Sequence, residues 1–189
     1  MRAAPSARTV NIPNLLTLAR LLVTPLFIIL LLRDQMMPAL MVFALAGISD
    51  GLDGLIARWF NQQTTLGAYL DPVADKVLLA SAFVCLSILE LVPDWLAVVV
   101  LSRDMLIIIG IAIFTLTEKK YAIRPSLVSK YTTVAQIVVV IVSLLVPGIP
   151  RLEPSQQLLI WTTAALTMIS GFHYVYVGLA ILQQTEETG

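Results

Sequence analysis

The chain has 189 residues, of which 58% are hydrophobic and only 13% are charged, and its mean hydropathy is +0.90. Soluble domains carry ~25% charged residues, so this composition excludes an ordinary water-soluble enzyme and a disordered protein. Twelve Lys and Arg balance twelve Asp and Glu, so no net charge favours nucleic acid as a partner, and the single cysteine excludes a disulfide framework.

Six apolar stretches follow one another along the chain, each near the ~20 residues that a membrane-spanning helix needs. Short segments with polar or turn-forming residues separate them. The pattern predicts an all-α fold: a polytopic integral membrane protein with six transmembrane helices in a single domain over residues 1–189. The expected spans are about residues 15–32, 37–60, 67–90, 95–116, 127–146 and 156–182.

The positive charges outside these spans predict the orientation. Asn11 and Pro13 suit a short interfacial segment before the first span, and six spans place both termini on one side. That side carries more Lys and Arg than the other, as cytoplasmic loops do. We therefore expect the termini and the active site to face the cytoplasm, in a bacterial inner membrane. The loop and terminal bases on the two sides are Arg2, Arg8, Lys119, Lys120 and Arg124 against Arg33 and Arg151.

Acidic residues inside the apolar stretches are the main exception to this pattern. Each Asp at the centre of a span costs ~2.5–3.5 kcal/mol on insertion scales. An ion pair explains one of them, since Asp104 follows Arg103, although neighbours on a helix point apart and pair poorly. The other four have only Arg58 and Lys76 near them in sequence. These four are Asp50, Asp53, Asp71 and Asp75.

Helix geometry brings the four carboxylates together. Asp50 and Asp53 are about 60° and ~4.5 Å apart on a helix, and Asp71 and Asp75 about 40° and ~6 Å, so each pair shares a face. The two helices are joined by a short polar segment and should pack antiparallel with both pairs at similar depth. Four converging carboxylates repel one another unless cations intervene. Oxygen ligands without His or Cys favour Mg²⁺, Mn²⁺ or Ca²⁺ over zinc, and we predict two ions.

Small residues and one arginine accompany the acids. Gly54, Ala57 and Gly67 allow close helix packing, and the same small residues also let a ligand approach the backbone. Arg58, one turn after Gly54, can contact a phosphate with two hydrogen bonds. Two divalent ions, a glycine-lined face and an arginine together suit a pyrophosphate.

A polar stripe in the first span has two interpretations. Asn14, Thr17 and Arg20 are spaced at i, i+3 and i+6, so they share a helix face that could bind a nucleotide. Alternatively, they mark the start of a helix at the membrane surface, with an arginine whose charged end reaches the headgroups.

The pattern Asp50-x2-Asp53-Gly54-x2-Ala57-Arg58-x8-Gly67-x3-Asp71-x3-Asp75 resembles the full signature of the CDP-alcohol phosphotransferase family. The segments 11–17 and 71–76 resemble its glycerophospholipid-synthesising branch. The resemblance implies a six-helix membrane enzyme, a homodimer, that uses Mg²⁺ or Mn²⁺. Such an enzyme transfers the phosphatidyl group of CDP-diacylglycerol to an acceptor hydroxyl and releases CMP.

The resemblance also implies residue roles. Asp50, Asp53 and Asp71 would bind the metals, with Asp75 completing the cluster and acting as the general base. Gly54, Ala57 and Gly67 would admit the cytidine nucleotide, and Arg58 would contact its phosphates.

The resemblance implies a glycerol-type alcohol as the acceptor, for which two members of the branch compete. Candidate acceptor-binding cations are Arg103, Arg124 and Lys130. Phosphatidylglycerophosphate synthases, which use glycerol 3-phosphate, typically have Arg-Glu at Arg103-Asp104 and a further Arg shortly after, which is missing here. The segments 43–47, 101–104 and 124–130 are more similar to cardiolipin synthases, whose acceptor is phosphatidylglycerol.

A divalent-cation transporter is an alternative from another class, because intramembrane acids also line ion pathways. It would need acids along a path to the far side, and the spans place none there. It would also leave the Gly54, Ala57, Arg58 and Gly67 set without a role.

Overall fold

The structure, a computed structural model, describes the backbone of residues 12–60, 65–116 and 127–186, and side chains in 21–49, 76–110 and 128–178. The described residues form long α-helices joined by short connections, with one 3₁₀ turn and no strand among them. The predicted all-α class is therefore confirmed. The elements are α1 Ile12–Leu32, α2 Met36–Phe60, α3 Thr65–Ile88, α4 Asp94–Leu116, α5 Leu127–Leu145, η1 Pro150–Leu152 and α6 Glu153–Glu186.

Each predicted span falls on one of these helices, with ends that differ by at most four residues. The agreement follows from the apolar stretches and from the turn residues between them, which interrupt helices wherever the backbone has to reverse. Two stretches of the described residues, Val128–Leu145 and Pro150–Gly178, are long and apolar enough to cross a bilayer. The apolar parts of three other helices are shorter: Leu21–Leu32, Met36–Ser49 and Lys76–Ile88.

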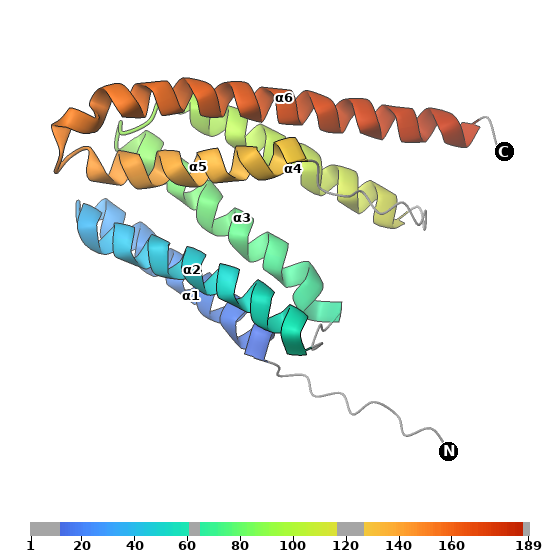
Figure 1. The fold of residues 1–189 in the computed structure, drawn as a ribbon, viewed down its shortest axis with the longest axis horizontal. Coiled ribbons are helices and arrows are strands. Elements are labelled where there is room, and N and C mark those ends of the chain that lie inside the picture. Colours follow the sequence, from blue (N-terminus) through green and yellow to red (C-terminus); the bar gives the residue numbers. More distant parts are fainter. Residues whose placement is uncertain (1–11, 61–64, 117–126, 187–189) are drawn as a thin grey trace, which may run out of the picture. The chain divides into compact units, whose positions relative to one another are not determined.

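The chain divides into two compact units whose boundary lies within α3, between Ser81 and Ala82. In the first unit α1 and α2 pack side by side and antiparallel (Figure 1). Phe27 of α1 and Phe43 of α2 are buried, and their ring centroids are 5.6 Å apart. Among the described side chains, this contact is formed mainly by apolar and aromatic residues.

In the second unit α6 packs against both α5 and α4. The turn η1 reverses the chain between α5 and α6, which run antiparallel (Figure 1). Pro150 begins this turn, where its missing N–H leaves no helical bond unmade. At the start of α4, Trp95 packs against Trp161 of α6, with ring centroids 5.1 Å apart.

Two helices end on a residue in the left-handed conformation without using glycine. Asp34 has φ 59° and Glu90 has φ 57°. The amide after Asp34 donates to the Leu30 carbonyl at 2.9 Å, and the amide after Glu90 donates to the Leu86 carbonyl at 2.8 Å. These are the bonds of a Schellman C-cap, so α1 and α3 end through the same local geometry.

Candidate functional site

The four acids of the predicted metal site lie on two neighbouring helices, as their spacing requires. Asp50 and Asp53 belong to α2, and Asp71 and Asp75 belong to α3. Their side chains lie outside the described residues, so their convergence stays a prediction. Within the side chains that the structure describes, no group of three His, Cys, Asp or Glu residues could hold a metal ion.

For the predicted nucleotide-binding residues, too, the structure describes only the backbone. Gly54, Ala57 and Arg58 belong to α2, and Gly67 belongs to α3. The predicted polar stripe of Asn14, Thr17 and Arg20 belongs to α1, whose helix confirms the assumed spacing. The side chains of all these residues, and Arg124 entirely, lie outside the described part of the chain.

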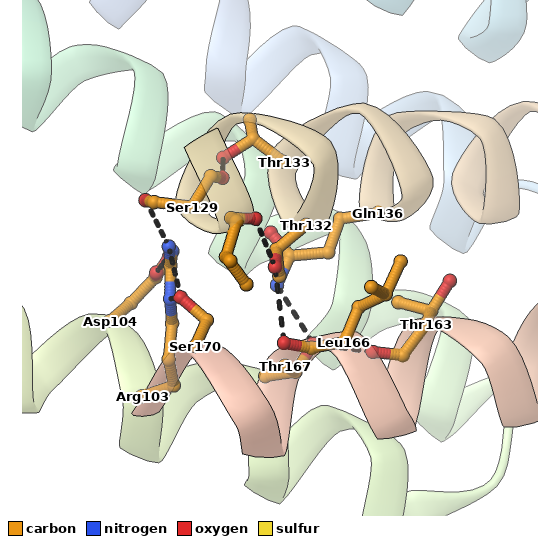
Figure 2. A network of polar contacts seen from close by, with 11 residues as sticks. Arg103, Asp104, Ser129, Thr132, Thr133, Gln136, Thr163, Leu166, Thr167 and Ser170 are labelled. Carbon is orange, nitrogen blue, oxygen red and sulfur yellow. Dashed lines mark hydrogen bonds and ion pairs between the residues drawn. The ribbon is translucent and has the colours of Figure 1, made fainter. Parts of the chain in front are cut away.

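Arg103, one of the three predicted acceptor-binding cations, is the centre of a buried polar network in the second unit. It lies on α4 and is only 3% exposed. Its Nη2 donates to Ser129 Oγ of α5 at 2.5 Å and to Ser170 Oγ of α6 at 3.2 Å, and its Nε donates to Ser170 Oγ at 3.4 Å. Figure 2 shows the guanidinium between these hydroxyls. One side chain thus connects three helices.

The same guanidinium pairs with the next residue in the chain, which corrects the sequence analysis. Arg103 Nη1 lies 2.6 Å from Asp104 Oδ1, and Asp104 is 5% exposed. Adjacent Cβ atoms on a helix do point apart, but the long arginine side chain folds back and closes the gap. Where the surroundings are apolar, each charge gains more from this contact than it would in water.

The hydrogen bonds leave the Arg103 guanidinium almost fully occupied. Of its five N–H groups, at most one, on Nη1, lacks a partner among the described residues. Its charge is also balanced by Asp104, so the pair is electrically neutral. An anion that reaches this point meets a neutral pair rather than an isolated cation.

Lys130, the second described acceptor-binding candidate, is exposed on α5. It directly follows Ser129, which is partly exposed and accepts a hydrogen bond from Arg103. The structure therefore brings two of the three predicted acceptor-binding residues to one end of α5, one buried and one at the surface.

A line of buried polar side chains continues from this network between α5 and α6. Thr132 Oγ1 bonds with the Val128 carbonyl at 2.8 Å and the Leu166 carbonyl at 3.1 Å, and Gln136 Nε2 donates to Thr167 Oγ1 at 3.4 Å (Figure 2). The sequence analysis did not single out these residues. Their signal is a recurrence of polar residues every three, four or seven positions, which places them on one helix face.

The opposite end of the α5–α6 pair is fastened by Gln156 of α6. Its Nε2 donates to the Leu91 carbonyl at 2.6 Å and to Ser143 Oγ of α5 at 2.9 Å. By contrast, Gln136 Oε1 is buried with no hydrogen-bond partner among the described residues. The two glutamines therefore differ in how well their polar atoms are satisfied.

Comparison with known proteins places this architecture in a family. Residues 10–169 match the family described as CDP-alcohol phosphatidyltransferase. A cardiolipin synthase (CMP-forming) of Rattus norvegicus is 35% identical over 209 residues, which cover 95% of this chain and 69% of the relative. The human cardiolipin synthase (CMP-forming) is 34% identical, with 92% of this chain and 63% of the relative covered.

A bacterial relative has a different acceptor in its name. The CDP-diacylglycerol–glycerol-3-phosphate 3-phosphatidyltransferase of Bacillus subtilis is 31% identical over 182 residues, which cover 87% of this chain and 93% of the relative. The chain thus spans nearly all of this bacterial relative but about two thirds of the mammalian ones.

The chain belongs to the CDP-alcohol phosphatidyltransferase family. It is a transferase of phospholipid biosynthesis, from a family of membrane proteins that generally use divalent metal ions. The predicted family and reaction class are confirmed, and the transferase is favoured over the cation transporter. The family match does not distinguish between the two acceptors, because the relatives include enzymes named for each reaction.

Proposed function

We propose that this chain transfers the phosphatidyl group of CDP-diacylglycerol to the hydroxyl of phosphatidylglycerol, which makes it a cardiolipin synthase that releases CMP. The similarity to CMP-forming cardiolipin synthases over more than nine tenths of this chain is the observation that carries the proposal. The alternative is a phosphatidylglycerophosphate synthase acting on glycerol 3-phosphate, supported by the Bacillus subtilis relative. Both reactions form the same kind of phosphate ester.

In the proposed reaction the acceptor oxygen attacks the phosphorus that bears the diacylglycerol. The bond from this phosphorus to the CMP oxygen breaks, CMP leaves, and Asp75 accepts the proton of the acceptor hydroxyl. Asp50, Asp53, Asp71 and Asp75 are a donor set suited to hard divalent cations. Two Mg²⁺ or Mn²⁺ ions held there would neutralise the pyrophosphate and its leaving group.

The remaining predicted residues would bind the two substrates. Gly54, Ala57 and Gly67 would leave room for the nucleotide of CDP-diacylglycerol, and Arg58 would contact its phosphates. We propose Asn14, Thr17 and Arg20 as further nucleotide contacts. Lys130, Arg124 and Arg103 would face the acceptor, with Lys130 supplying an exposed positive charge and Arg103 at most one free N–H.

The proposed setting is a bacterial inner membrane, which six helices cross so that both termini and the site face the cytoplasm. A short interfacial segment would precede the first span. Residues 1–189 would act as one domain, in contact with membrane lipids and as a homodimer. The apolar stretches Val128–Leu145 and Pro150–Gly178, each long enough to cross a bilayer, support the membrane location.

The decisive assay supplies the purified protein with CDP-diacylglycerol, Mg²⁺ or Mn²⁺, and either phosphatidylglycerol or glycerol 3-phosphate. We expect CMP and cardiolipin with phosphatidylglycerol. Phosphatidylglycerophosphate as the main product would establish the alternative acceptor. A folded protein that releases no CMP with either acceptor would refute the enzymatic proposal.

The base role of Asp75 can be tested with a matched pair of Asp→Asn variants. Asp75→Asn removes the proton acceptor but keeps the size of the side chain, so we expect loss of turnover with Mn²⁺ still bound. Asp34→Asn is the control, because Asp34 is exposed and asparagine also tolerates its left-handed backbone. Turnover near the wild-type level in Asp75→Asn would exclude this residue as the base.

A further inference from the structure

Two tryptophans form a pair at the surface of the second unit, near the end where α4 and α6 begin. Trp95 is the second residue of α4 and Trp161 the ninth of α6, and their ring centroids are 5.1 Å apart. The side chains are 40% and 67% exposed, and neither indole N–H donates to a described residue. Large apolar rings with free N–H groups suit a boundary that is apolar on one side and wet on the other.

The exposed side chains change character at the level of this tryptophan pair. Gln156 of α6 donates to the Leu91 carbonyl just before α4, so the two helices begin at one level. After the tryptophans, no Asp, Glu, Lys or Arg is exposed among the described side chains of α4 and α6. Val98, Met105 and Phe172 are each more than half exposed there. The exposed polar residues before the tryptophans include Glu90, Asp94, Arg151, Glu153 and Gln157.

We propose that the Trp95–Trp161 pair lies in the headgroup layer of a lipid bilayer and sets the depth at which α4, α5 and α6 are immersed. The charged residues before the pair then meet water and headgroups, and the apolar residues after it meet lipid tails. The inference rests on the membrane location in the proposed function and is independent of the acceptor. It goes beyond that function by naming a surface that contacts the headgroups.

This depth places the buried ion pair inside the hydrocarbon core. Arg103 lies eight residues after Trp95, and Ser170 lies nine after Trp161, which correspond to ~12 Å and ~13.5 Å along the helices. Since the core is ~30 Å thick, the guanidinium lies toward its middle, where ionisable side chains pair with one another. The depth thus accounts for the contacts of Arg103 with Asp104 and with hydroxyls of two other helices.

Lys130 lies at a similar depth, because it directly follows Ser129, the partner of Arg103 on α5. It is exposed, and a charge at this depth needs water or an anion around it rather than lipid tails. The proposed depth therefore requires a polar space beside Lys130, which its proposed role in binding the acceptor requires as well.

Quenching of tryptophan fluorescence in bilayers of brominated phosphatidylcholine tests the proposed depth. Trp59→Phe removes the tryptophan of α2, so the Trp95–Trp161 pair supplies the emission. We expect bromines near the ester end of the acyl chain to quench this emission at least about twofold more strongly than bromines near its methyl end. Stronger quenching by the methyl-end bromines, or none by either lipid, overturns the inference.

A deep reference comes from Met105→Trp in a chain whose three tryptophans are replaced by Phe. Met105 is exposed on α4 and lies ten residues after Trp95, or ~15 Å along the helix. We therefore expect the reverse order, with methyl-end bromines quenching more strongly. The matched control keeps Trp95 alone, through Trp59→Phe with Trp161→Phe, and should be quenched from the ester end. The same order in both chains overturns the proposed depth.

Circular dichroism in the same bilayers verifies that each variant is folded. If the Met105→Trp chain does not fold, Trp59→Phe decides the question, because it leaves the second unit unchanged. Folded chains in which neither the native pair nor the indole at position 105 is quenched by any brominated lipid would refute the membrane location in the proposed function. Deep quenching of the native pair refutes only the inference.

Discussion

The two units of this molecule hold their helices together by different means. In the first unit the described part of the α1–α2 contact, formed by side chains in 21–49, is mainly apolar, and Thr24 is the only buried polar residue among the unit's described side chains. In the second unit the described part of α4, α5 and α6 buries nine polar or charged residues. These are Arg103, Asp104, Thr132, Gln136, Ser143, Gln156, Thr163, Thr167 and Ser170.

The difference follows from what lipid does to helix association. Lipid tails are as apolar as leucine, so burying an apolar face against another helix gains little beyond close packing. A hydrogen bond between helices has a direction and a partner, and therefore fixes which residues face each other. We infer that packing joins α1 to α2, whereas polar pairing sets the register of α4, α5 and α6.

The largest expected effect comes from breaking the ion pair. Arg103→Met leaves Asp104 buried without its cation, which typically destabilises a protein by about 3–5 kcal/mol. The double variant Arg103→Met with Asp104→Leu removes both charges and should recover most of that loss. Unfolding of the purified protein in mixed detergent micelles measures both. A double variant as unstable as the single one would contradict the role assigned to the pair.

The apolar contact of the first unit gives the next largest effect. Phe27→Ala removes the ring that packs against Phe43 and leaves a cavity, so we expect a loss of about 3 kcal/mol. Phe27→Leu, which fills most of that space, is the control and should lose less than half as much. Equal losses in the two variants would show that packing volume does not hold α1 against α2.

The two buried glutamines offer a matched comparison within the second unit. Gln156→Leu leaves the Leu91 carbonyl without the Gln156 bond, and we expect a loss of about 2 kcal/mol. Gln136→Leu removes one long hydrogen bond to Thr167, at 3.4 Å, together with a buried oxygen that lacks a partner among the described residues, so the two effects offset and we expect a loss below about 1 kcal/mol. Unfolding in mixed detergent micelles measures the stability of both variants. Equal losses of stability would show that the hydrogen bonds of Gln156 contribute no more than those of Gln136.

The smallest expected effect concerns the contact between α6 and the Arg103 side chain. A Cβ added at Gly171 would lie 3.8 Å from Arg103 Cγ, an ordinary van der Waals distance. Gly171→Ala should therefore change stability by no more than about 0.5 kcal/mol and leave turnover unchanged. A larger loss would mean that the α4–α6 contact is tighter than the structure shows.

Most of the helical framework could be predicted from the sequence, and most of the polar network could not. Apolar stretches and turn residues fixed the helix bounds to within about a turn, because these signals are local. The Arg103–Asp104 pair was judged unfavourable from Cβ directions, which ignore how far an arginine side chain can reach. Ser129 and Ser170 depend on which helices become neighbours, and that information is not local.

The predicted metal site is intermediate between the helical framework, which the sequence predicts well, and the polar network, which it does not. Spacing alone places Asp50 and Asp53 on one face of α2, and Asp71 and Asp75 on one face of α3, and the helices themselves are confirmed. Whether the two faces meet depends on how α2 and α3 pack, which no local pattern specifies. The family resemblance, rather than the spacing, supplies the individual role of each acid.

The length of α6 has a consequence for the space beyond the bilayer. Its 34 residues correspond to ~51 Å of helix, whereas the hydrocarbon core is ~30 Å thick. A tilt large enough to submerge the whole helix would exceed the ~40° limit seen for membrane helices. In the proposed membrane setting part of α6 therefore has to extend beyond the hydrocarbon core, into or past the layer of lipid headgroups.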